Sequence, residues 1–451
     1  MKNRSQELGE KSIISLLIKF SIPAIIGTLV NALYNVVDRI FIGNGVGSLG
    51  IAGLTIGFPI MMISMASAML IGIGTTSLIS LKLGEGQKDE AERIMGNGIM
   101  GLILISLTLS IVSIAFLTPL LKLFGATETI LPYSRDYMQI ILLGNVLMAI
   151  GFGMNNFIRA EGNPKIAMYT MLIGAIINII LDPIFIFVFN WGIKGAAFAT
   201  IIAQGFSAVW VLYYFLAGQS VLKIKKVNLR FKKQIMMKIL AIGSAPFAMQ
   251  IAASVLNLVL NNSLRVYGGE TAIAGIGIVF SLMMLLVMPV IGISQGVQPI
   301  IGYNYGAKEF TRVKEALKIA IYAATSIAVI AFIITRLYPE HLVALFAPDD
   351  ADVINFGGKA IRLFLLMLPV VGFQMVGANY FQAIGKPKSA MLLTLSRQVL
   401  LLIPLLLILP RFYGLDGILY AGPLADFGAA LLTFFWLTKE FRILSRPVTE
   451  V

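Results

Sequence analysis

The sequence predicts an all-α integral membrane protein with twelve membrane-spanning helices in two parallel six-helix repeats. The first observation behind this prediction is composition: 58% of the residues are hydrophobic and 13% are charged, whereas soluble domains carry about 25% charged residues. The apolar runs are long and continuous, which favours helices over a β-barrel. The second observation is a repeated heptapeptide, Gly-x-Pro-Lys-x-Ala-Met, at 162–168 and again at 385–391.

The repeat extends over most of the chain. The two heptapeptides lie 223 residues apart in a chain of 451 residues. Such a near-constant shift over long segments is typical of duplication. Further pairs at a shift of 222 or 223 are Ile51-Ala52-Gly53 with Ile273-Ala274-Gly275, Asn156 with Asn379, Gly192 with Gly414, Gly195 with Gly417 and Ala199 with Ala421.

Twelve segments are long and apolar enough to cross a bilayer, which takes about 20 residues as a helix. Six spans per half is an even number, so both halves enter the membrane from the same side and are parallel repeats. The spans are predicted near 13–37, 50–80, 94–117, 136–160, 166–190 and 195–217, and near 236–262, 272–302, 316–337, 359–384, 389–410 and 416–437.

The basic residues predict the orientation and the domain boundaries. Lys and Arg concentrate in the loops on one side, which places both termini in the cytoplasm of a cell whose plasma or inner membrane holds the protein. A basic linker at 219–238 separates an N-terminal lobe (1–218) from a C-terminal lobe (239–451). The net charge of +13 is therefore expected to meet anionic lipid headgroups, not nucleic acid.

Four polar side chains in the first half are candidates for function, because polar groups at membrane depth default to a functional role. Asp38 lies at the outer end of the first span, Asn178 and Asp182 share one face of the fifth, and Thr200 lies in the sixth. Their oxygen atoms suit a proton or a hard cation such as Na⁺. The alternatives are that Asp182 and Pro183 only end a helix, and that Asp38 pairs with Arg39 at the lipid surface.

Two prolines accompany these residues. Pro183 removes a backbone donor, so the carbonyl near residue 179 becomes available as a further ligand. Pro23 lies within the first span and predicts a kink. A packing bend with no moving part is the alternative for Pro23.

The second half lacks the acidic set. Asp38 and Asp182 correspond to positions near Asn261 and Pro404, so ion coupling is expected in the first half alone. Arg397 and Asp426 do lie in second-half spans, where they either line a cavity or pair with each other.

Enzyme motifs are missing or misplaced. There is no P-loop for ATP and no cysteine, and His341 is the only histidine. A Gly-x-Ser-x-Gly match around Ser294 lies inside a predicted span, where a nucleophile elbow cannot form. We therefore predict neither an enzyme nor a bound cofactor, although a membrane-embedded transferase remains a remote alternative.

The chain as a whole resembles a multidrug and toxic compound extrusion (MATE) transporter of the DinF-like branch. The resemblance rests on the first span with Pro23 and Asp38, on Asn-Phe-x-Arg-Ala-x-Gly-Asn-Pro at 156–164, on Asn178 with Asp182-Pro183, and on Gly-Ala-Ala-x-Ala-Thr at 195–200. It implies a V-shaped, two-lobed antiporter that exports cationic amphiphilic compounds in exchange for H⁺ or Na⁺. Asp38, Asn178, Asp182 and Thr200 match the branch's coupling positions, and Tyr34, Tyr137 and Asn155 or Asn156 resemble its cavity residues.

The predicted function is thus secondary active multidrug efflux by alternating access. We expect small amphiphilic drugs and membrane lipids as partners, and a monomer. A lipid-linked precursor flippase of the same superfamily is the alternative. The twelve spans and the few buried Lys or Arg residues favour the drug exporter.

Overall fold

The computed structural model describes residues 5–218, 220–348 and 350–445, and within these ranges it is helical and contains no strand. The chain divides into two compact units. The N-terminal unit comprises residues 1–10 and 26–247, and the C-terminal unit comprises residues 11–25 and 248–451. The predicted division at 1–218, 219–238 and 239–451 stays a prediction.

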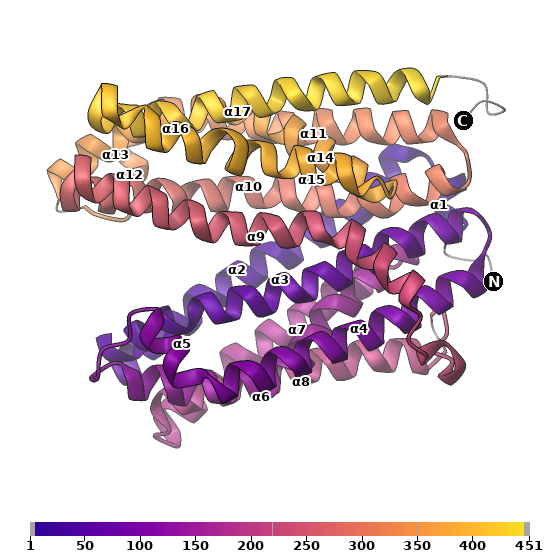
Figure 1. Cartoon of the computed structure of the whole chain (residues 1–451), viewed down its shortest axis with the longest axis horizontal. Coiled ribbons are helices and arrows are strands. Elements are labelled where there is room, and N and C mark those ends of the chain that lie inside the picture. Colours follow the sequence, from indigo (N-terminus) through magenta and orange to yellow (C-terminus); the bar gives the residue numbers. More distant parts are fainter. Residues whose placement is uncertain (1–4, 219, 349, 446–451) are drawn as a thin grey trace. The chain divides into compact units, whose positions relative to one another are not determined.

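Long helices run alongside one another within each unit (Figure 1). The first half of the chain contains α1 (Glu7–Glu10), α2 (Ile13–Val46), α3 (Ser48–Gly84), α4 (Lys88–Ala115), α5 (Leu117–Leu123), α6 (Leu131–Ala160), α7 (Pro164–Pro183), the π-helix η1 (Ile184–Val188) and α8 (Gly192–Leu216).

The second half begins with a 3₁₀ turn in the basic linker. Its elements are η2 (Lys226–Leu229), α9 (Lys233–Tyr267), α10 (Gly269–Gly306), α11 (Phe310–Leu337), α12 (Pro339–Ala344), α13 (Ala351–Phe364), α14 (Leu368–Ala383), α15 (Pro387–Leu395), the π-helix η3 (Ser396–Leu402), α16 (Ile403–Ile408) and α17 (Pro410–Ile443).

The predicted membrane helices are confirmed, and most of them are longer than predicted. Eleven helices among the described residues are long and apolar enough to cross a membrane, or twelve if one bent pair is a single span. The bent pair is α13 with α14, which meet at 52° where one straight span was predicted over 359–384. Pro369, in the first turn of α14, has no backbone N–H to donate to the carbonyl four residues earlier, so the helix of α13 cannot continue through it.

The repeated heptapeptide is a shared turn, as its sequence indicates. Gly162 and Gly385 have φ angles of 101° and 72°, a left-handed conformation that favours glycine. Pro164 and Pro387 then open α7 and α15, where proline is well suited because a helix leaves its first N–H groups unpaired.

The first helix of each repeat belongs to two units. Residues up to Ile25 of α2 belong to the C-terminal unit, and the helix continues through Pro23 into the N-terminal unit. Likewise α9 belongs to the N-terminal unit up to Phe247 and to the C-terminal unit from Ala248. Pro246 precedes that second boundary, 223 residues after Pro23.

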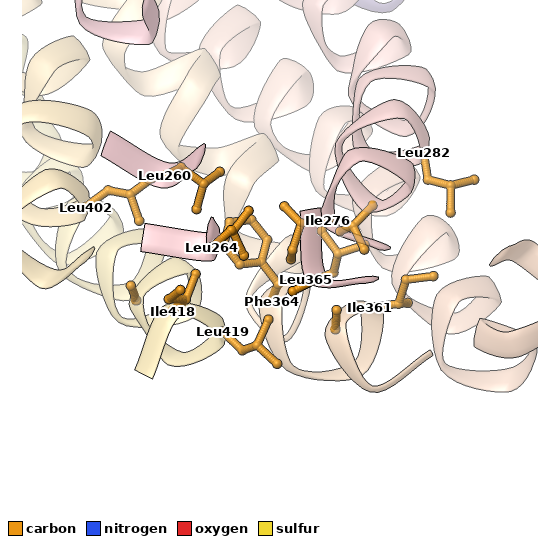
Figure 2. Packing of buried hydrophobic residues seen from close by; sticks show 14 of the residues in the cluster. Leu260, Leu264, Ile276, Leu282, Ile361, Phe364, Leu365, Leu402, Ile418 and Leu419 are labelled. Carbon is orange, nitrogen blue, oxygen red and sulfur yellow. The ribbon is translucent and has the colours of Figure 1, made fainter. Parts of the chain in front are cut away.

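Each unit has its own buried apolar clusters. In the C-terminal unit Phe364 and Leu365 pack among Leu264, Ile276 and Ile361 (Figure 2). Between membrane helices, such packing stabilises the unit through van der Waals contacts. In the N-terminal unit Tyr137 and Met138 lie in a corresponding cluster, which places the N-terminal half of α6 beside α2 and α8.

Glycine allows α9 to approach α3 within the N-terminal unit. A Cβ atom on Gly243 would overlap the carbonyl oxygen of Leu70. By contrast, a Cβ atom on Gly277 of α10 would meet no atom within 4 Å. The two glycines therefore form a matched pair for testing this packing.

We expect Gly243→Ala to lower the thermal unfolding temperature of the purified protein, because overpacking costs about 1–3 kcal/mol. Gly277→Ala should leave it unchanged or raise it slightly, since alanine is the better helix former. Equal unfolding temperatures for the two variants would contradict the close approach of α3 and α9.

Candidate functional site

The predicted coupling residues lie together in the N-terminal unit. Asp38 of α2 and Asp182 of α7 are 7% and 0% exposed, and their carboxyl groups lie close enough to interact with each other. Asn178 is 1% exposed and donates from Nδ2 to Asp182 Oδ1 at 3.3 Å. Its Nδ2 also lies 3.5 Å from Thr200 Oγ1. Residues from α2, α7 and α8 therefore converge on one buried site.

Two glycines on α2 explain how Asp38 reaches α7. A Cβ atom on Gly27 would lie 2.6 Å from the sulfur of Met171, and one on Gly45 would overlap Ile186. Larger residues at these positions would hold the helices apart on both sides of Asp38. The sequence contains these glycines, but only the structure shows what they face.

Three oxygen atoms in the site have no hydrogen-bond partner in the described part of the chain. They are Asp38 Oδ1, Asp182 Oδ2 and Asn178 Oδ1, and all are buried. Unpaired buried acceptors are costly. Carboxylate, amide and hydroxyl oxygens are ligands for a hard cation, so this donor set fits Na⁺ as well as a proton.

The site does not have the composition of a transition-metal centre. Among the described residues, no group of three or more His, Cys, Asp and Glu side chains could hold a metal ion. The site offers two carboxyl groups and neutral oxygen atoms, which suits a weakly bound monovalent cation better than Zn²⁺.

Aromatic hydroxyls border the carboxyl groups. Tyr137 of α6 is 1% exposed, and its hydroxyl group lies near Thr200, Asp38 and Asp182. Tyr34 lies one turn before Asp38 and interacts with the same two acids. The structure thus brings the two predicted cavity tyrosines to the predicted ion site.

Asn155 and Asn156 lie elsewhere. They follow Tyr137 by 18 and 19 residues on α6, which is roughly 27–29 Å along a helix. Asn156 instead donates to the carbonyl of Phe152 and accepts from Arg159. Asn155 Oδ1 has no hydrogen bond among the described residues. A cavity role for these asparagines stays a prediction.

The residues around Pro183 adopt a π-helix. The backbone continues from α7 through Pro183 into η1, so Asp182 remains helical. A π segment adds a residue to the turn and is frequent at functional sites. It relieves the clash that a proline causes with the carbonyl of Ile179, and Asp182 stays within hydrogen-bonding reach of Asn178.

Arg397 and Asp426 pair with each other in the C-terminal unit. Arg397 Nε donates to Asp426 Oδ1, and the two side chains are 17% and 4% exposed. Of the two alternatives that the sequence left open, direct pairing is confirmed.

Glu161, which was not among the residues predicted from the sequence, is a buried carboxyl group at the C-terminal end of α6. It accepts hydrogen bonds from Tyr214 and from Ser220 Oγ and Leu222 N, at 2.6 and 3.1 Å for the latter two. Its exposure is 0%. The signal was available, because Glu161 lies inside the 156–164 segment directly before the turn glycine.

Glu161 anchors the start of the basic linker to the N-terminal unit. Glu92 of α4 anchors the linker a few residues further along the chain. Glu92 is 1% exposed, accepts from Lys223 N at 3.1 Å and lies 2.5 Å from Lys225 Nζ. The basic linker is therefore anchored to the N-terminal unit by two buried carboxyl groups.

The sequence matches the model of a known family. The MatE family model matches residues 23–184 and 246–408, one range in each repeat, and the chain belongs to this family of MATE transporters. It is accordingly a multi-pass membrane transporter and not an enzyme.

Two curated relatives cover nearly the whole chain. The multidrug export protein MepA of Staphylococcus haemolyticus is 30% identical over 428 residues, which is 94% of this chain and 93% of the relative. MepA of Staphylococcus aureus is 29% identical over 432 residues, covering 96% and 95%.

Solved structures of MATE transporters are similar to this chain. A structure of the MATE multidrug transporter DinF-BH in complex with rhodamine 6G is 41% identical, with a TM-score of 0.91 over 99% of this chain and 100% of that chain. An outward-facing multidrug resistance MATE family transporter has a TM-score of 0.93 at 24% identity over 99% of each chain, which supports the fold alone. The resemblance to the DinF-like branch is confirmed.

Burial raises the pKa of the Glu161 carboxyl group above its usual range, while its hydrogen bonds act in the opposite direction. A group with a raised pKa in the folded state contributes least to stability once the pH exceeds that pKa. We expect the thermal unfolding temperature of the wild type, relative to Glu161→Gln, to fall as the pH rises above about 4.3, the usual pKa of glutamate.

Glu128→Gln serves as the matched control, because Glu128 is 83% exposed and pairs with Lys122 on the surface. Its unfolding temperature should follow the wild type at every pH. A constant difference between wild type and Glu161→Gln across the pH range would contradict a buried, ionisable anchor.

Proposed function

We propose that this transporter exports cationic amphiphilic compounds in exchange for a cation bound by Asp38 and Asp182. The observation that carries the proposal is the direct approach of two carboxyl groups inside a membrane helix bundle. Two neighbouring carboxyl groups repel each other strongly when both are ionised. A buried pair of this kind therefore binds a proton or another cation. The coupling ion is H⁺ or Na⁺.

The neighbouring residues support each part of the cycle. Asn178 and Thr200 add neutral oxygen ligands to the two acids. Tyr34 and Tyr137 place aromatic rings beside the negative charge, an arrangement that also attracts an organic cation. An organic cation can therefore compete with the coupling ion for the same negative charge, and competition of this kind couples the two transport steps.

The substrate class is supported by the relatives. The MepA proteins are named for multidrug export, and DinF-BH was solved with rhodamine 6G. We therefore propose this dye, a cationic amphiphile, as a transported probe.

Alternating access is supported by the two divided helices. Each unit boundary within α2 and α9 falls one or two residues after a proline. Proline breaks a backbone hydrogen bond and lowers the stiffness of a helix at that point. We propose that ion binding rearranges α2 around Pro23, and that the protein acts as a monomer.

The sharpest test of the site is Asp182→Asn. The amide keeps the volume of the carboxyl group but removes its charge, so we expect at least a roughly tenfold loss of gradient-driven rhodamine 6G efflux from proteoliposomes. Asp136→Asn is the control, because Asp136 is an exposed acid of α6 that pairs with Lys194. Wild-type efflux by Asp182→Asn would overturn the proposal.

The same proteoliposomes distinguish the ions. An imposed pH gradient and an imposed Na⁺ gradient are applied separately, and the one that drives efflux in wild type and not in Asp182→Asn identifies the coupling ion. A failure of both gradients to drive efflux would exclude ion exchange.

Orientation is testable because the chain contains no cysteine. We propose cytoplasmic termini, so a single cysteine at Gln87, between α3 and α4, should react only with membrane-permeant maleimide in intact cells. A cysteine at Thr127, between α5 and α6, should also react with an impermeant maleimide. The reverse labelling pattern would contradict cytoplasmic termini.

A further inference from the structure

The N-terminal unit contains a cavity of about 220 Å³ that is separate from the paired acids. It lies between the end of α4, the short helix α5 and the first turns of α6, at the opposite ends of α4 and α6 from the basic linker. Its polar lining comes from Thr118, Arg135 and Gln139, and none of the described residues that line it is acidic. The cavity therefore combines one positive charge with neutral hydrogen-bonding groups.

The guanidinium of Arg135 is available to a ligand. Arg135 is exposed, and it forms no hydrogen bond or ion pair with another described residue. The adjacent acid, Asp136, pairs instead with Lys194 at 3.2 Å. A guanidinium presents five N–H donors in a planar fork that matches the oxygen atoms of a phosphate group. The amide of Gln139 and the hydroxyl of Thr118 line the same cavity and add neutral donors.

The second repeat shows how the corresponding place is filled in the C-terminal unit. A Cβ atom on Gly53 would contact Tyr133, and a Cβ atom on Gly275 would contact Phe356. The matching contacts show that the shift of 223 residues also relates the first turns of α6 to α13. Residues of the cavity can therefore be compared with their counterparts one by one.

An ion pair occupies the place of two cavity residues. Gln139 corresponds to Arg362 at a shift of 223, and Thr118 corresponds to Glu340 at a shift of 222. In the C-terminal unit, Arg362 Nη2 lies 2.9 Å from Glu340 Oε1. The second repeat thus supplies its own carboxylate at this place.

The N-terminal unit has the cation without that carboxylate. Arg135 corresponds to Gly358, where a Cβ atom would lie 2.9 Å from Glu340 Oε1. A side chain at this position therefore begins beside the space that the acid fills in the second repeat. Thr118 leaves this space without a negative charge in the first repeat, so an external anion can supply what Glu340 supplies in the other unit.

Two exposed apolar stripes lead away from the cavity. Their members are Leu104, Leu107 and Ile111 on α4, and Leu143 and Leu147 on α6. Each stripe continues the helix face that lines the cavity, because its members follow one another at intervals of three or four residues. The two helices lie side by side, since Ser110 Oγ donates to the carbonyl of Leu142 at 2.7 Å. A ligand with a phosphate group and apolar chains is complementary to this arrangement.

We propose that the cavity binds the phosphate group of an anionic phospholipid in the leaflet opposite the basic linker. Arg135 donates to the phosphate oxygens through a charge-assisted fork, Gln139 and Thr118 contact the headgroup, and the acyl chains lie along the two apolar stripes. A lining without acids offers no partner for the ammonium group of a zwitterionic lipid, so an anionic headgroup fits best. This binding site does not depend on the proposed exchange of cations.

The test counts lipid molecules by native mass spectrometry of the detergent-purified protein, titrated with dioleoyl phosphatidylglycerol. Two further probes separate the parts of the lipid. Dioleoylglycerol keeps the acyl chains and lacks the phosphate, whereas glycerol 3-phosphate keeps the phosphate and lacks the chains. Arg135→Gln removes the cation, and Thr118→Glu introduces the acid that the second repeat has at this position.

We expect Arg135→Gln to weaken the tightest phosphatidylglycerol binding event about tenfold, the effect of losing a charge-assisted hydrogen bond. Thr118→Glu should weaken it at least as much, because the new carboxylate repels the phosphate and pairs with Arg135. Wild type should bind dioleoylglycerol and glycerol 3-phosphate more weakly than the complete lipid. Arg265→Gln, which removes an exposed arginine from the last turn of α9, should bind the lipid like wild type.

Equal phosphatidylglycerol affinities of wild type and Arg135→Gln would overturn the site. An equal loss in Arg265→Gln would also overturn it, since lipid binding would then follow net charge and not this cavity. If glycerol 3-phosphate binds as tightly as the complete lipid, the ligand is a free phosphate compound and the lipid assignment fails. Thermal unfolding of each variant confirms that it is folded before its affinity is compared.

Discussion

The approach of Asp38 to Asp182 is the constraint on which the N-terminal unit depends. Two carboxyl groups brought together inside a helix bundle require a compensating positive charge. Gly27 and Gly45 let α2 approach α7 closely enough, and the π turn after Pro183 keeps Asp182 helical. Asn178 and Thr200 then supply neutral oxygen atoms around the acids. Local packing is thereby linked to the exchange of cations that we propose for this site.

The duplication explains why the two halves share their turns but differ in the charged residues of their interiors. The heptapeptide turns, with Gly162 and Gly385 in left-handed conformations, are the same in both halves because a tight loop between two membrane helices demands them. The charges differ: the first half brings the buried acids Asp38 and Asp182 together, and the second half pairs Arg397 with the buried Asp426. Divergence at interior positions, with shared turns, gives two similar lobes different chemistry.

The membrane helices and part of the candidate site could be predicted from the sequence. Hydropathy and the repeat predicted the membrane helices, because a bilayer imposes length and composition on each span. The one-turn spacing predicted that Asn178 and Asp182 share a face. What could not be predicted depends on tertiary structure: the bend between α13 and α14, and the hydrogen bonds that bury Glu161 against the linker. The choice between pairing and cavity lining for Arg397 likewise needed tertiary structure.

The central claim is that Asp38 and Asp182 together hold one exchangeable positive charge, and it is tested most directly by counting ions on purified protein. Binding of radioactive sodium by equilibrium dialysis, and proton release on addition of rhodamine 6G in weakly buffered solution, are measured for wild type and for Asp38→Asn combined with Asp182→Asn. The account predicts about one Na⁺ bound or one proton released per wild-type chain, and none for the double variant. Undiminished ion binding or proton release in the double variant would contradict it.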